Sequence, residues 1–137
     1  MVHARIGDER TRSISRQLLQ ERLQRESPAW KKAWIHTAIG LSLLEDGDDQ
    51  SSRLGIVQLL YVPALYAETQ PYLAGVCLAE ASVRLAEMGR GEAAVKLAGE
   101  LNAEYSTHAA TENALIRELI RQYKEQSIPT SPPEERL

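Results

Sequence analysis

The sequence has no phenylalanine, one cysteine and no long apolar run, and each of these scarcities excludes a class of protein. A single cysteine, Cys77, cannot form a disulfide within the chain, which favours a reducing compartment. No window approaches the roughly 18 apolar residues that span a bilayer, and the N-terminal segment lacks the apolar centre of a secretory signal. We therefore expect a soluble, cytoplasmic protein with no membrane partner.

Acidic residues outnumber basic ones, but the two signs are unevenly distributed. The formal net charge is -3, yet residues 1–32 hold eight Lys or Arg against four Asp or Glu. In the same region Trp30, Lys31, Lys32 and Trp34 combine aromatic and basic groups, as nucleic-acid binders do. Weak nucleic-acid binding by this basic end is one hypothesis, although the acidity of the whole chain favours a solvated helix face.

Apolar residues recur at helical spacing along most of the chain, and nowhere do they alternate with polar residues as in a strand. The pattern predicts an all-α fold. We expect a flexible N-terminus over residues 1–8, one helical domain over 9–126 and a disordered, proline-rich tail over 127–137. The predicted helices cover 9–25, 28–45, 50–67, 71–88, 91–104 and 107–126.

Proline, glycine and capping residues set the predicted helix ends. Three segments that carry a possible capping residue predict helix starts: Ser27-Pro28, Thr69-Gln70-Pro71 and Ser106-Thr107. Gly47 and Gly89 predict helix ends in left-handed geometry, and Asp48 or Asp49 should cap the helix after Gly47. Pro63 predicts a kink or break near Val62, with helix resuming over 64–67.

Two segments of the chain align when Gly47 is superposed on Gly89, an offset of 42 residues (89 minus 47). His36, Ile39-Gly40 and Leu43 then correspond to Leu78, Ala81-Ser82 and Leu85. The small residues, Gly40 and Ser82, allow neighbouring helices to approach closely, and the bulky positions fill the space around them. The spacing therefore predicts two related helical hairpins.

This order of bulky and small residues resembles the tetratricopeptide repeat. The resemblance implies a short right-handed stack of antiparallel helical hairpins with five to six helices. Its repeat units would be about 30–67 and 71–106, with the helices at 9–25 and 107–126 covering the ends. It also implies a non-catalytic protein-protein interaction or scaffold module, either complete or a fragment of a longer repeat protein.

In proteins of that family the first helix of each unit lines a concave surface. A contiguous apolar face there would need a partner's segment, the chain's own N-terminal helix or a second copy to cover it. We expect self-coverage or a homodimer ahead of a peptide ligand. The predicted partner-binding residues are Trp34, Thr37, Leu41, Leu44, Val76, Ala79, Val83 and Ala86.

Residues with catalytic or metal-binding chemistry are scattered along the sequence. Asp46, Asp48 and Gln50 have the spacing of a calcium loop, but Ser51 and Val57 stand where that loop needs Gly and Glu. Cys77 lies among apolar neighbours, so a packing role is favoured over that of a nucleophile.

We expect no metal, no cofactor and no enzymatic activity. The alternative is a small ligand-binding or enzymatic domain with a groove near Trp34, His36 and Glu80.

Overall fold

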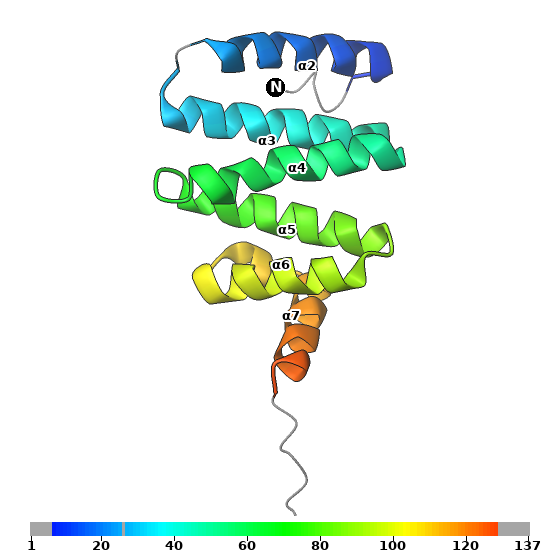
Figure 1. The fold of residues 1–137 in the computed structure, drawn as a ribbon, viewed down its shortest axis with the longest axis vertical. Coiled ribbons are helices and arrows are strands. Elements are labelled where there is room, and N and C mark those ends of the chain that lie inside the picture. Colours follow the sequence, from blue (N-terminus) through cyan, green and yellow to red (C-terminus); the bar gives the residue numbers. More distant parts are fainter. Residues whose placement is uncertain (1–6, 26, 129–137) are drawn as a thin grey trace, which may run out of the picture.

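The chain folds into a layered stack of helices (Figure 1). The structure is a computed structural model and describes residues 7–25 and 27–128. This part of the chain contains no strand, which confirms the predicted all-α stack of antiparallel hairpins. The elements are α2 (Glu9–Gln24), α3 (Ala29–Asp46), α4 (Asp49–Leu65), α5 (Pro71–Glu87), α6 (Gly91–Glu104), a 3₁₀ turn (Ala109–Glu112) and α7 (Ala114–Gln126).

The two glycine-containing turns form as predicted. Gly47 follows α3 with a φ of 78°, and Gly89 follows α5 with a φ of 76°. No other described residue has a positive φ, so glycine occupies both positions that disfavour a side chain. The Asp48 carboxylate accepts a hydrogen bond from the Ser51 N–H at 2.9 Å and caps α4.

Of the kink or break predicted near Val62, the break is wrong. α4 continues through Pro63 to Leu65, and the Tyr66 N–H donates to the Val62 carbonyl at 2.8 Å. Pro63 removes the backbone hydrogen bond to the Leu59 carbonyl. Val62 is fully buried, so packing holds it in helical geometry despite this loss. The predicted continuation over 64–67 is also too long, since α4 ends at Leu65.

Three predicted helix starts differ in detail. Pro28 and Gln70 stand at the cap positions of α3 and α5 without a side-chain hydrogen bond, so neither Ser27 nor Thr69 is a cap. The last helix begins at Ala114 rather than 107, because the Asn113 side chain accepts from the Leu115 and Ile116 N–H groups.

The predicted flexible terminus and disordered tail fall mostly on residues 1–6 and 129–137, which lie outside the described residues. Of the N-terminal segment, Gly7 and Asp8 are described. The Asp8 carboxylate accepts from the Thr11 N–H at 2.7 Å and caps α2. The first helix therefore begins at Glu9, as predicted.

Small residues bring the helices of each hairpin together, as the repeat predicted. A Cβ on Gly40 of α3 would lie 2.9 Å from the Gly55 carbonyl oxygen of α4, so glycine is required for this approach. In the second hairpin the buried Ser82 hydroxyl donates to the Ala94 carbonyl oxygen at 2.8 Å. The hairpins meet where Thr37 Oγ1 lies 3.3 Å from Cys77 Sγ.

Ion pairs attach α2 to the end of α3. Arg12 Nε and Arg16 Nη2 lie 2.9 and 2.8 Å from the two carboxylate oxygens of Asp46, and all three side chains are largely shielded from solvent. Arg16 Nη1 also donates to Ser42 Oγ at 3.1 Å. Asp46 therefore positions α2. The two aspartates with calcium-loop spacing have other roles, since Asp46 forms ion pairs and Asp48 caps α4.

Gly40→Ala should destabilise the protein by about 1–3 kcal/mol, because the added methyl group would overlap Leu59 and the Gly55 backbone. Urea unfolding followed by circular dichroism measures the change. Gly91→Ala is the matched control, since a Cβ there meets nothing within 4 Å, and its stability should be unchanged or slightly higher. Equal unfolding midpoints for Gly40→Ala and the unmodified protein would contradict this packing.

Candidate functional site

The eight residues predicted to line the concave surface differ widely in exposure. Trp34 is 42% exposed, whereas Thr37, Leu44 and Ala79 are buried. The remaining four are half-buried: Leu41, Val76, Val83 and Ala86. The expectation of one exposed apolar face is therefore wrong for Thr37, Leu44 and Ala79, and the binding role of the others stays a prediction.

Thr37 and Leu44 are buried against two different helices. Leu44 packs on α4, where a Cβ on Gly55 would lie 3.0 Å from Leu44 Cδ2. Thr37 donates to the Ala33 carbonyl at 2.9 Å, and its hydroxyl also meets the Cys77 thiol of α5. The part of α3 that faces α5 is thus an interface between hairpins. The exposed part lies farther round the helix, at Trp30 and Trp34.

Trp34, His36 and Glu80 do not form one groove. His36 is buried against α4, where its Nδ1 lies 2.8 Å from Gln58 Oε1 and its ring stacks on Tyr61. Trp34 lies about 200° round α3 from His36, because successive residues turn by about 100°. Of the three, only Trp34 reaches the cleft described next.

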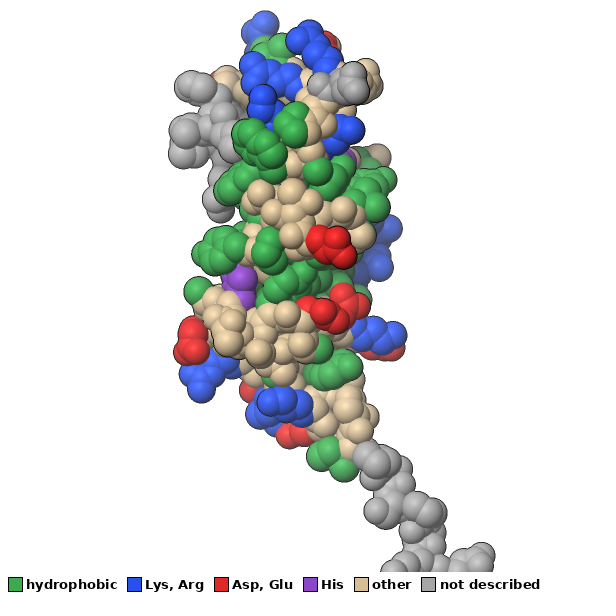
Figure 2. Space-filling view, turned by 90° about the vertical axis from the view of Figure 1, so that its left-hand side faces the viewer, with side chains coloured by type: hydrophobic (Ala, Val, Ile, Leu, Met, Phe, Trp, Pro, Cys, Tyr) green, Lys and Arg blue, Asp and Glu red, His purple; other side chains and the backbone are tan. Residues whose placement is uncertain are grey.

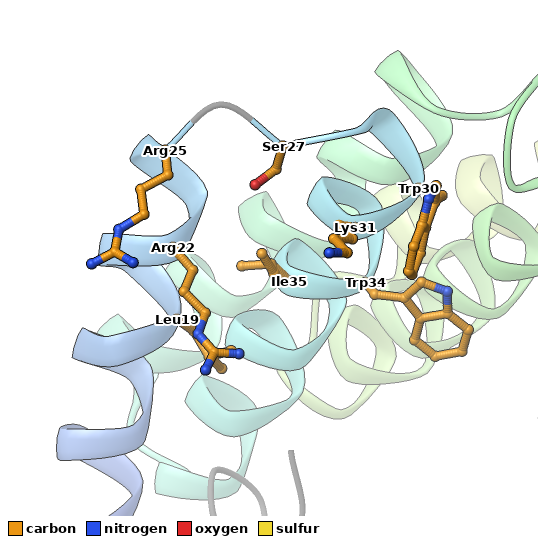
Figure 3. A pocket seen from close by; sticks show the side chains of 8 residues that line it. All are labelled: Leu19, Arg22, Arg25, Ser27, Trp30, Lys31, Trp34 and Ile35. Atoms are coloured by element: carbon orange, nitrogen blue, oxygen red, sulfur yellow. The ribbon is translucent and has the colours of Figure 1, made fainter.

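An open cleft of about 710 Å³ lies between α2 and α3. In Figure 3, Arg22 and Arg25 come from α2 on one side, Lys31 and Trp34 from α3 on the other, and Ser27 from the connecting segment. Trp30 and Trp34 are 48% and 42% exposed, and they are the two tryptophans of the chain. The full lining is Leu19, Arg22, Arg25, Ser27, Trp30, Lys31, Trp34 and Ile35.

The cleft is cationic and aromatic. Arg22, Arg25 and Lys31 contribute positive charge, and no acidic side chain is among the described residues that line it. The Lys31 ammonium lies 5.5 Å from the centre of the Trp30 ring, within range of a cation–π interaction. Figure 2 shows Lys and Arg side chains gathered at the α2 end of the stack, with hydrophobic side chains beside them. Such a surface attracts an anion that also carries apolar groups.

Sequence reasoning found the elements of this cleft but not their arrangement. The combination of Trp30, Lys31 and Trp34 with basic residues upstream was visible in the sequence. That Arg22 and Arg25 face these residues depends on the antiparallel packing of α2 on α3, which the Asp46 ion pairs fix.

The surface next to the cleft on α2 is apolar. Ile14 and Leu18 precede Arg22 by eight and four residues, so they lie on the same face of the helix, and both are about half exposed. On α3, Leu41 follows Trp34 by seven residues and is half-buried. The α2–α3 surface therefore has a basic, aromatic end and an apolar end.

α4 exposes a second apolar row away from the cleft. Leu54, Val57, Tyr61 and Leu65 recur at spacings of three and four residues, which places them on one helix face, and all are exposed. Gly55 and Gln58 of the same helix face α3 instead. The row has no charged member, so it offers hydrophobic contact without the electrostatic selectivity of the cleft.

The residues that could act as nucleophile or base have structural partners. Burial raises the pKa of the Cys77 thiol to about 11, which keeps it protonated and unreactive near neutral pH. His108 Nε2 lies 2.9 Å from the Tyr72 carbonyl oxygen, and its Nδ1 accepts from the Ala110 N–H.

Neither a metal site nor a membrane-spanning helix is present within the described residues. There, no group of three His, Cys, Asp or Glu side chains could hold a metal ion. Among the helices described, none is long and apolar enough to cross a bilayer.

Comparison with family models, with curated proteins and with solved structures finds no significant match.

Relative to free tryptophan, the fluorescence of the protein should be quenched more strongly by iodide than by caesium, because the cations of the cleft concentrate anions beside both indoles. The difference should shrink as sodium chloride is added, since salt screens exposed charges. Stern–Volmer plots for the two ions measure it.

Replacing Arg22 and Arg25 by Gln should reduce the iodide preference. Replacing Arg90 and Lys96, which lie on the α5–α6 side, should leave it unchanged. Equal quenching by the two ions in the unmodified protein would contradict the assigned charge of the cleft.

Proposed function

We propose that this chain is a non-catalytic protein-protein interaction or scaffold module that resembles the tetratricopeptide repeat. Its docking surface is the side of α2, α3 and α5 that carries the cleft. The observation that supports this most directly is the cleft itself, where both tryptophans stand half exposed beside Arg22, Arg25 and Lys31.

Tryptophan and arginine are the residues that most often dominate binding energy in protein interfaces. A Trp side chain that is half exposed still has a large apolar area to bury against a partner. Trp30 and Trp34 are separated by one helical turn, so they form one continuous contact area. The flanking arginines supply fixed hydrogen-bond donors that can orient a partner.

A non-catalytic role is supported by the chemistry of the described residues. Cys77 has a raised pKa, and His36 and His108 are engaged in hydrogen bonds that hold helices and turns together. Every buried side-chain polar atom in the described part has a partner, so none is left oriented into a cavity for catalysis.

The chain's own N-terminal helix does not cover this surface. α2 packs beside α3 through Asp46 and Ser42, and Trp34 stays exposed next to it. Of the sequence-based alternatives, a partner protein and a second copy therefore remain. We favour a partner, because the cations of the cleft select for charge of the opposite sign.

A display library of random peptides tests the location of the surface. The unmodified protein should enrich a family of peptides, and Trp34→Glu with Leu41→Glu should abolish the enrichment, because they place charge in the contact area. Leu54→Glu with Leu65→Glu is the matched control on α4 and should leave enrichment intact.

Circular dichroism of each variant verifies folding, and light scattering reports self-association. The proposal fails if no peptide family is enriched, or if the α4 variant alone abolishes binding. It also fails if the folded Trp34/Leu41 variant enriches the same peptides as the unmodified protein.

A further inference from the structure

The cleft and its apolar continuation together specify the chemistry of an occupant. From Arg25 to Ile14 the exposed face of α2 extends about 16 Å, at 1.5 Å per residue. Its cations, Arg22 and Arg25, lie at one end, and its apolar side chains, Ile14 and Leu18, lie at the other. An extended peptide of about five residues, at roughly 3.3 Å each, covers this length.

The α3 side of the surface has the same order. Lys31 and the two tryptophans lie opposite Arg22 and Arg25, while Leu41 lies farther along α3 from Trp34. Because α2 and α3 are antiparallel, Leu41 is level with the apolar part of α2: Arg16 contacts Ser42, one residue beyond Leu41. Both walls of the surface therefore change from basic and aromatic to apolar in the same direction.

We propose that this surface binds a short segment of another protein in which carboxylate side chains are followed by large apolar side chains. The inference rests on the proposed function and adds the partner's chemistry to it. The carboxylates pair with Arg22, Arg25 and Lys31, where an arginine can hold a carboxylate with two parallel hydrogen bonds. The apolar side chains contact Trp34, Leu41 and Leu18.

The apolar end argues against a nucleic-acid strand. A strand carries a phosphate at every nucleotide and needs cations along its whole path. Here the cations that line the cleft lie at one end, and its continuation at Ile14, Leu18 and Leu41 is apolar.

The test reads the composition of the peptides that the unmodified protein enriches from the random library. Acidic residues followed by apolar residues should dominate. A synthetic peptide of that pattern, made with glutamates and leucines, should change the fluorescence of both tryptophans and bind more weakly as salt is added. Arg22→Glu with Arg25→Glu should weaken binding at least about tenfold.

Matched controls isolate the charge of the cleft. Arg90→Glu with Lys96→Glu makes the same change of net charge at the start of α6 and should leave affinity unchanged, since neither residue lines the cleft. Arg22→Gln with Arg25→Gln should lose affinity without charge reversal. A peptide with lysines in place of glutamates should not bind, and one with serines in place of leucines should bind weakly.

Several outcomes overturn the inference while leaving the proposed function standing. Enriched peptides without acidic residues, or equal binding by the lysine peptide, would show that charge does not select the partner. Tighter binding of single-stranded oligothymidylate than of the glutamate–leucine peptide would assign the cleft to nucleic acid and would overturn the proposed function as well. A dimer in light scattering that Arg22→Glu with Arg25→Glu dissociates would assign it to a second copy. Absence of any enriched peptide would instead overturn the proposed function.

Discussion

The close packing of α3 on three sides is the constraint on which the rest of the structure depends. Gly40 brings α3 against α4, where neither helix has room for a Cβ at the crossing point. Thr37 contacts Cys77 of α5, and Asp46 holds two arginines of α2. Gly40, Thr37 and Asp46 thus contact three different helices. These contacts place α3 at the centre of the N-terminal half.

This packing decides which part of α3 can serve a partner. With three neighbours packed on α3, Trp30 and Trp34 stay about half exposed beside the C-terminal half of α2. The cations of α2 and the indoles of α3 are therefore brought together by the fold, although they come from different helices. A change at Asp46 would act on the cleft through the position of α2 rather than by contact.

Local signals predicted most of the fold, because helix periodicity and left-handed glycines act within a few residues. Where local and tertiary preferences compete, as at Pro63, burial of Val62 prevailed. The site was harder to predict, since exposure depends on which helices meet. Ala79 has the spacing of a surface residue on a concave face, yet it is buried in the folded chain. The cleft required the relative placement of α2, which no local pattern encodes.

The most direct test of the account is a two-dimensional nitrogen–proton NMR spectrum recorded while a glutamate–leucine peptide is added. The two indole N–H resonances belong to Trp30 and Trp34 alone, so they report on the cleft without interference. The account predicts that both shift and saturate together, with backbone shifts confined to α2, α3 and the adjoining side of α5. Unchanged indole resonances, or shifts concentrated on α4 or α7, would contradict it.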